Sequence, residues 1–208
     1  MHYPRRHLNP FQASRLGVMT ADVLVAIGAA LAGSALAGAT RTRTHIYEAF
    51  TASGAPAVHV KSTVRGECNG GSAATDRDDA WRCFSGNDVY DPCFSSSKAK
   101  GIVLCPTGPG SSSAVKIKLT ARLSDGNRGK PSKSGAPWAV ETTSGTKCEL
   151  NTGATTIVDH RRANYFCEHS TSVLWGSPSR ESEPWTIYSA PATATKLTRK
   201  VKISVAWF

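Results

Sequence analysis

Apolar and polar residues alternate with a period of two in residues 114–123 and again in residues 200–208. The apolar members are Val115, Ile117, Leu119, Ala121 and Leu123 in the first stretch and Val201, Ile203, Val205 and Trp207 in the second. Successive side chains of a β-strand point to opposite faces of a sheet. The pattern therefore predicts two half-buried strands, each with a lysine-bearing polar face.

Shorter runs of strand-like sequence occupy much of residues 58–208. They are VHVKSTV at 58–64, GIVLC at 101–105, WAVET at 138–142, TKCELN at 146–151, ATTIVD at 154–159, ANYFCEH at 163–169, SVLWG at 172–176 and WTIYS at 185–189. Turn-forming residues separate the runs, and TSG at 143–145 predicts a hairpin. Many short strands divided by turns predict a mainly β, antiparallel fold that resembles a sandwich or a barrel.

Residues 76–86 show a different pattern. Ala80, Cys83 and Phe84 recur at the spacing of one helix face, and aspartates precede them where they would favour the positive end of a helix dipole. Gly86 is a residue that commonly ends a helix. We therefore predict one short helix near residues 76–86.

The cysteines favour a fold that is stabilised by disulfides. They are Cys68, Cys83, Cys93, Cys105, Cys148 and Cys167. The number is even and no CxxC occurs, so three disulfides in an oxidising compartment are favoured over a zinc site. Six cysteines allow fifteen connectivities. We favour the local pairs Cys68–Cys83, Cys93–Cys105 and Cys148–Cys167, each of which closes a loop of ~13–20 residues.

The beginning of the chain has the order of an export signal. The first part of residues 1–39 contains three arginines, Arg5, Arg6 and Arg15. An uncharged apolar run follows over residues 23–37 and ends in small residues. This order predicts a secretory signal peptide, and the alternative is a retained single-span membrane anchor within residues 16–39. Residues 40–57 are predicted to be a linker, and residues 58–208 to be an extracytoplasmic β domain.

The formal net charge of +10 at pH 7 favours anionic partners. We expect an anionic polymer of the cell envelope, a lipid headgroup or an envelope protein rather than nucleic acid, with membrane contact only through the N-terminal segment. The candidate binding residues form a basic face and are Lys116, Lys118, Arg122, Lys200 and Lys202. They form one stripe if their two strands are neighbours; the alternative is the solvated side of a half-buried sheet.

Catalytic motifs are weak in this sequence. Residues 95–98 have the SxxK spacing of serine acyl-enzymes, but they lie in a polar loop instead of opening a buried helix. Asp159, His160 and His169 are the acid–base candidates, although neighbouring residues of a strand point to opposite faces. We therefore lean toward a protein that is not an enzyme and uses no metal or cofactor. The alternative is a secreted hydrolase that uses His160 or His169 with a nearby carboxylate.

Aromatic residues offer a further alternative. Trp138, Tyr165, Trp175, Trp185 and Tyr188 could form a stacking platform for sugars, with Trp138 and Trp175 as the candidates we name. Most of these rings are expected in the core, because a small β domain needs large apolar side chains.

The run DAWRC at 79–83, followed by Asn87 and DPCF at 91–94, resembles the signature of a set of uncharacterised exported, cysteine-rich proteins of actinobacteria. A later section completes the resemblance with Pro137-Trp138, Cys148, Asn164-Tyr165 and Cys167. The resemblance spans roughly residues 62–208 and implies an exported, disulfide-bonded domain, without any transferable activity or ligand. We interpret the DAWRC–DPCF run as a structural staple. We predict an exported, non-enzymatic protein of the cell envelope that binds an anionic component or an envelope partner.

Overall fold

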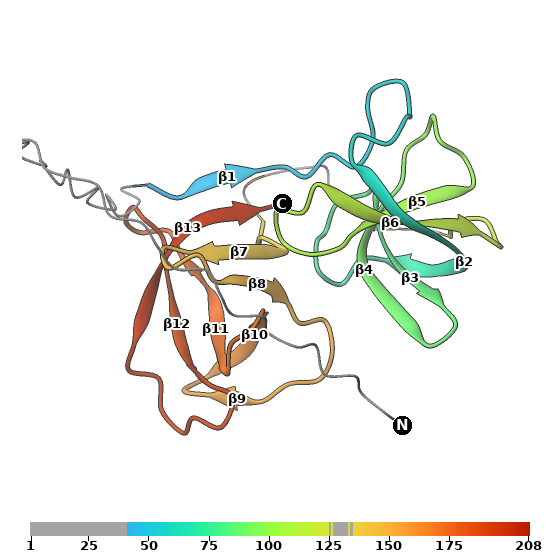
Figure 1. Cartoon of the computed structure of the whole chain (residues 1–208). Coiled ribbons are helices and arrows are strands. Elements are labelled where there is room, and N and C mark those ends of the chain that lie inside the picture. Colours follow the sequence, from blue (N-terminus) through green and yellow to red (C-terminus); the bar gives the residue numbers. More distant parts are fainter. Residues whose placement is uncertain (1–40, 125, 127–132, 134) are drawn as a thin grey trace, which may run out of the picture. The chain divides into compact units, whose positions relative to one another are not determined.

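The computed structural model describes residues 41–124, 126, 133 and 135–208. In these residues the chain forms thirteen β-strands and no helix (Figure 1). The predicted signal peptide or membrane anchor in residues 1–39 lies outside the described residues. Within the described ranges, no helix is long and apolar enough to cross a membrane.

Five strands close into a barrel, which we call barrel 1 (Figure 1). They are β2 (His59–Gly71), β3 (Ala80–Ser85), β4 (Asp88–Phe94), β5 (Ile102–Pro106) and β6 (Ser113–Leu119). Each successive pair is antiparallel. Because the number of strands is odd, the first and last strands run in the same direction, and the barrel closes through a parallel β2–β6 pair. Closure leaves barrel 1 without an open sheet edge.

Six later strands pair in a second ring, which we call barrel 2. They are β7 (Ala139–Thr142), β8 (Lys147–Leu150), β10 (Arg161–Cys167), β11 (Ser172–Ser179), β12 (Thr186–Pro191) and β13 (Lys200–Trp207). All six pairings are antiparallel, as an even number of strands allows, and β13 pairs with β7 to close the ring. Outside the ring, the short strand β9 (Ile157–Val158) pairs with β10, and β1 (Arg43–His45) runs parallel to β13.

Inward-facing residues fill both barrels. The core of barrel 1 contains Cys68, Trp81, Cys83, Cys93, Val103, Cys105 and Ile117. The core of barrel 2 contains Val140, Cys148, Tyr165, Leu174, Trp185, Ile187, Ile203, Ala206 and Phe208. The alternation predicted from sequence is confirmed, because Ile117 and Ile203 are fully buried whereas Lys118 and Lys202 are exposed.

A third apolar cluster joins the two barrels and the segment before barrel 1. Barrel 1 contributes Ala80, Phe94, Leu104 and Ala114, barrel 2 contributes Ala139, Val205 and Trp207, and the connecting segments contribute Tyr47, Ala49, Ala74 and Trp138. The ring of Tyr47 lies 5.2 Å from that of Phe94 and 5.9 Å from that of Trp138. We call this cluster the junction core.

The prediction of a short helix near residues 76–86 is wrong. Residues 80–94 form the β3–β4 hairpin, in which Ser85 faces Asp88 across a tight turn and Gly86 has a φ of 59°. Trp81 and Cys83 point into barrel 1, while Ala80 lies on the opposite face in the junction core. In so short a run the apolar residues fit a period of two as well as a helical spacing. The hydrogen-bonded pairing of β3 with β2 and β4 makes this run a strand and not a helix.

The three predicted disulfides are confirmed as Cys68–Cys83, Cys93–Cys105 and Cys148–Cys167. Cys68 lies directly opposite Cys83 on β2 and β3, and Cys148 lies opposite Cys167 on β8 and β10. The register of β4 and β5, with Phe94 opposite Leu104, places the remaining pair opposite each other in the same way. Each disulfide therefore ties two neighbouring antiparallel strands.

Residues 40–57, predicted as a linker, contribute to the fold from residue 41 onward. The strand β1 adds to the edge of β13, and the Tyr47 amide donates to the Phe208 carbonyl at 2.8 Å. Tyr47 and Ala49 are buried. This segment is ordered by its pairing with β13, which is far away in the sequence. The sequence of the segment itself has no pattern that predicts this pairing.

Two buried tyrosines, Tyr47 in the junction core and Tyr165 in the core of barrel 2, allow a matched test of whether each hydroxyl contributes a hydrogen bond to stability. The Tyr47 hydroxyl has no hydrogen-bond partner among the described residues, and burial raises its pKa to about 12. The Tyr165 hydroxyl instead donates to the Pro137 carbonyl at 2.8 Å. Tyr47→Phe should leave the free energy of unfolding unchanged or raise it, whereas Tyr165→Phe should lower it by about 1 kcal/mol. Urea unfolding with the disulfides intact measures both, and equal losses would contradict the assignment.

Candidate functional site

Charges of opposite sign are separated along the chain in barrel 1. Residues 95–124 contain five cationic side chains, Lys98, Lys100, Lys116, Lys118 and Arg122, and no aspartate or glutamate. Residues 76–91 contain five aspartates and two arginines. Since β5 and β6 belong to the first stretch and β3 and β4 to the second, the β5–β6 side of barrel 1 is positive and the β3–β4 side is negative. We call residues 95–124 the basic segment.

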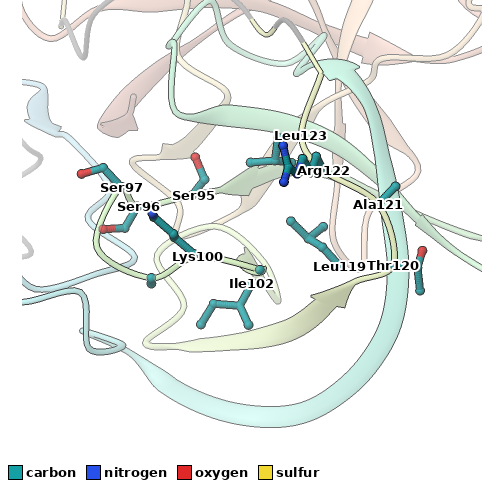
Figure 2. Close-up of a pocket in the computed structure, with 12 residues that line it drawn as sticks. Ser95, Ser96, Ser97, Lys100, Ile102, Leu119, Thr120, Ala121, Arg122 and Leu123 are labelled. Atoms are coloured by element: carbon teal, nitrogen blue, oxygen red, sulfur yellow. The ribbon is translucent and has the colours of Figure 1, made fainter.

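The basic segment encloses a cavity of about 820 Å³ at one end of barrel 1 (Figure 2). The cavity lies between the β4–β5 loop and the chain that leaves β6. Its lining consists of Ser95, Ser96, Ser97, Ala99, Lys100, Gly101, Ile102, Leu119, Thr120, Ala121, Arg122 and Leu123. The volume lies within the range of ~300–1,000 Å³ that is common for small-molecule sites. We call it the barrel-end cavity.

Hydrogen bonds to barrel 1 hold the β6 side of this cavity. Thr120 donates to the Gly66 carbonyl from its backbone nitrogen at 2.8 Å and from Oγ1 at 3.1 Å. The Leu119 amide donates to the Gly101 carbonyl at 2.9 Å. A Cβ atom on Gly66 would lie 2.1 Å from the Phe84 carbonyl oxygen, so only glycine fits at this position. The position of Thr120 at the edge of the cavity therefore depends on the close approach of the Gly66 backbone to the Phe84 carbonyl inside barrel 1.

The β4–β5 side is held by Ser95 and by a turn that precedes β2. Ser95 Oγ accepts from Trp81 Nε1 at 2.9 Å, and the Ser95 amide donates to the Asp79 carbonyl at 2.8 Å. A Cβ atom on Gly54, which has a φ of 86°, would lie 2.6 Å from Lys98 Cβ. The turn at Gly54 therefore lies directly against the loop and supports it.

The donors left free in the barrel-end cavity suit an anion. Lys100 and Arg122 are exposed, and neither has an ion-pair partner within the described part of the chain. Ser96 Oγ accepts from the Lys98 amide at 3.2 Å, which leaves its own proton for a ligand. Ile102, Leu119 and Leu123 supply half-buried apolar surface between the donors. The arrangement offers positive charge, hydroxyl donors and an apolar floor.

The structure divides the five residues that were predicted to form one basic face. Lys116 and Lys118 lie on β6, where Lys118 is opposite Arg65 of β2. Lys200 and Lys202 lie on β13, whose partners are β1, β7 and β12. The two strands belong to different barrels and are not neighbours, so the predicted single stripe does not form. The fifth residue, Arg122, follows β6 and lines the barrel-end cavity.

On barrel 2, Lys200 belongs to a separate cationic group around Tyr188. The Lys200 Nζ lies 5.0 Å from the centre of the Tyr188 ring, and the Arg161 guanidinium lies 4.5 Å from it. Cations over an aromatic ring are attracted to its negative faces. The ring is therefore occupied by the protein's own side chains.

Neither tryptophan named as a sugar platform has an accessible face. Trp138 is 1% exposed in the junction core, and Trp175 is 0% exposed. Trp175 packs with Val173 and Leu197, and its Nε1 donates to the Ala190 carbonyl at 3.3 Å. These rings serve as core residues, because barrels this small need their largest apolar side chains inside.

The acid–base candidates occupy turns. Asp159 and His160 have φ values of 47° and 59° between β9 and β10, and His169 has a φ of 52° after β10. Asp159 Oδ2 accepts from the Leu197 amide at 2.8 Å, so this carboxylate holds a loop. All three residues are exposed, and among the described residues no hydrogen bond joins the Asp159 carboxylate to His160. The geometry therefore offers no assembled catalytic group around either histidine.

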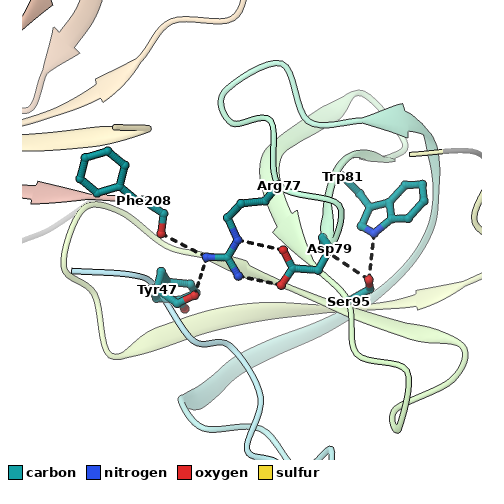
Figure 3. Close-up of polar contacts among 6 residues, drawn as sticks. All are labelled: Tyr47, Arg77, Asp79, Trp81, Ser95 and Phe208. Carbon is teal, nitrogen blue, oxygen red and sulfur yellow. Dashed lines mark hydrogen bonds and ion pairs between the residues drawn. The ribbon is translucent and has the colours of Figure 1, made fainter. Parts of the chain in front are cut away.

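The start of the DAWRC–DPCF run makes structural contacts with the residues around it (Figure 3). Arg77, just before the run, is 4% exposed and binds Asp79 with two bonds, Nε to Oδ1 at 2.8 Å and Nη2 to Oδ2 at 2.6 Å. Its Nη1 donates to the carbonyls of Tyr47 at 2.8 Å and Phe208 at 3.1 Å. The guanidinium lies 4.4 Å from the centre of the Phe94 ring.

Comparisons of the chain with protein-family profiles, with curated proteins and with solved structures find no match. In the described ranges no group of three or more His, Cys, Asp or Glu side chains could hold a metal ion. The case for the barrel-end cavity as a binding site therefore depends on its geometry alone. Sequence reasoning named Arg122 as a binding residue, considered residues 95–98 only as an SxxK fragment, and missed Lys100. The signal that could have found it is the acid-free composition of the basic segment.

Arg77 gives a direct test of the staple. We expect Arg77→Met to lower the free energy of unfolding by about 1.5–3 kcal/mol, because the change removes both bonds to the partly exposed Asp79 carboxylate and the donor to the Tyr47 carbonyl. Arg82→Met is the control, since the Arg82 guanidinium lies over the Phe84 ring at 5.9 Å. Urea unfolding of both variants measures the difference. A loss of similar size in the control would contradict a special role for Arg77.

Asp91 should make stability depend on pH. Burial raises the pKa of Asp91, against the opposing effect of bonds from Ser72 Oγ at 2.5 Å and the Ala73 amide at 3.1 Å. A raised pKa means that the folded state binds the proton more tightly than the unfolded state. The contribution of Asp91 to stability is therefore greatest at low pH and is lost as pH rises through its folded pKa.

Asp91→Asn removes this ionisation. Its melting temperature should rise relative to that of the wild type as the pH increases from about 3 to about 6. Asp88→Asn, an exposed change in the same hairpin, controls for the loss of a charge. Melting curves by circular dichroism across this range supply the measurement. Parallel profiles for the wild type and Asp91→Asn would show that Asp91 has no such effect.

Proposed function

We propose that this protein is an exported, non-enzymatic component of the cell envelope that binds an anionic wall or membrane component, or an envelope partner, through the basic segment of barrel 1. The observation that carries the proposal is the composition of residues 95–124, which have five cationic side chains and no acidic one. Opposite charge brings anionic ligands to such a surface at long range.

The three disulfides support export, because they are consistent with an oxidising environment. The signal-like sequence of residues 1–39 and the resemblance to exported actinobacterial proteins agree with the same location. Within the proposal, the segment is a cleaved signal peptide or an anchor in residues 16–39, and the two barrels are extracytoplasmic.

The positive charge of barrel 1 remains available to a ligand. Arg77–Asp79 is the one ion pair between described residues, and it lies in the junction between the barrels. Lys116 and Lys118 have no carboxylate within 4.0 Å among those residues. In the parallel pairing of β2 with β6, Arg65 lies opposite Lys118, so the positive surface extends across both strands. Like charges side by side destabilise a sheet unless an anion lies between them.

Sedimentation with isolated cell envelopes tests the proposal. Purified protein with intact disulfides should bind envelopes at low ionic strength and lose binding as salt rises, since screening shortens the range of its charges to about 8 Å at physiological ionic strength. Lys116→Gln/Lys118→Gln should weaken binding more than the matched variant Lys200→Gln/Lys202→Gln on barrel 2. Binding that is indifferent to salt, or equal losses from the two variants, would argue against the basic segment as the binding surface.

A further inference from the structure

The barrel-end cavity combines two kinds of surface that one class of ligand needs together. Its donors are cationic and hydroxyl groups, and the surface between them is aliphatic. Among the described residues that line it there is no aspartate or glutamate. We propose that this cavity binds an anionic phospholipid, with the phosphate between Lys100 and Arg122 and the adjoining acyl carbons on the aliphatic floor. The inference rests on the proposed function and narrows its ligand class.

The two cations come from opposite sides of the cavity. Lys100 lies on the β4–β5 loop, and Arg122 lies on the chain that leaves β6, as Figure 2 shows. A guanidinium presents a planar fork of donors that matches two phosphate oxygens, and an ammonium adds a compact positive charge. Because the two groups approach from different elements, a phosphate placed between them would bridge both sides of the cavity.

Serine hydroxyls complete the polar side of the cavity. Ser97 is exposed and has no hydrogen-bond partner among the described residues. Ser96 Oγ already accepts from the Lys98 amide, so its proton is the group that remains to donate. Ser95 is occupied by Trp81 and Asp79 and is not counted as a ligand group. Neutral hydroxyl donors suit the oxygens of a phosphodiester.

The aliphatic floor distinguishes a lipid from a wall polymer or a free anion. Ile102, Leu119 and Leu123 are half-buried in the lining, and in Figure 2 Leu119 lies between Lys100 and Arg122, while Leu123 lies beside Arg122. A free phosphate or a hydrophilic polymer would leave this surface in water. The first carbons of an acyl chain would cover it, and burial of apolar area favours binding in proportion to the area covered. The lining of the cavity therefore suits an amphiphile with a negative headgroup.

The test is a calorimetric titration of the full-length protein, with its disulfides intact, with dihexanoyl phosphatidylglycerol below its critical micelle concentration. Dihexanoyl phosphatidylcholine is the neutral comparison, and glycerol 3-phosphate is the headgroup without acyl chains. We expect saturable binding of the anionic lipid and much weaker binding of the other two. Lys100→Gln/Arg122→Gln should weaken the affinity for the anionic lipid by about tenfold or more.

The matched control is Lys200→Gln/Lys202→Gln on barrel 2, which removes the same charge and should leave the affinity unchanged. Residues 1–39 are the same in every variant, so any binding of lipid by that segment cancels in the comparison. Equal losses in the two variants would overturn the proposal, as would equal affinity for phosphatidylcholine. Glycerol 3-phosphate binding as tightly as the anionic lipid would identify a phosphate site without a lipid component and overturn it too.

Envelope sedimentation separates the failure of this inference from that of the proposed function. If salt-sensitive binding to envelopes persists while the anionic lipid does not bind, the lipid assignment is wrong and the basic segment has another anionic ligand. If binding to envelopes is also missing, both proposals fail.

Discussion

The buried guanidinium of Arg77 is the interaction on which the arrangement of the two barrels depends. It joins three parts of the chain, namely Asp79 at the entry to barrel 1, the Tyr47 carbonyl after β1 and the Phe208 carbonyl after β13. Without the arginine the Asp79 carboxylate would lose both of its bonds and the Tyr47 carbonyl would lose its arginine donor, and Arg77 itself is 4% exposed. A lysine has one point of charge and could not serve three acceptors in this plane.

The same interaction occupies one of the carboxylates on the acidic side of barrel 1. Asp79 is taken by Arg77, and Asp91 accepts from Ser72 and the Ala73 amide. These carboxylates are held by structural partners close to their own strands. The cations of the basic segment lie on β6, on the loop before β5 and on the chain after β6, and residues 95–124 contain no acid. Positive charge on that side is therefore available to a ligand, and the barrel-end cavity lies within it.

Disulfides and close backbone contacts attach the edge of the barrel-end cavity firmly to barrel 1. Two of the three disulfides lie in the core of barrel 1 and tie β2 to β3 and β4 to β5. Gly66 allows β2 to approach the Phe84 carbonyl, and its own carbonyl holds Thr120 on the rim. A site held by main-chain bonds on a cross-linked barrel needs little rearrangement to receive a ligand.

The sequence by itself predicted the strands whose alternation is long, a mainly β fold stabilised by disulfides, and the pairing of cysteines close in the chain. Those features depend on local periodicity and on short loops. It did not determine the β3–β4 hairpin, because Ala80, Cys83 and Phe84 fit a helix face as well as a strand. It also left open whether the lysines of β6 and β13 are neighbours, and whether Trp138 and Trp175 are exposed. Only the tertiary structure decided these points, because strand pairing, ring closure and burial arise between residues far apart in the chain. The barrel-end cavity has the same origin, since the loop with Lys100 and the chain with Arg122 line one cavity only when β5 and β6 are placed side by side in a closed barrel.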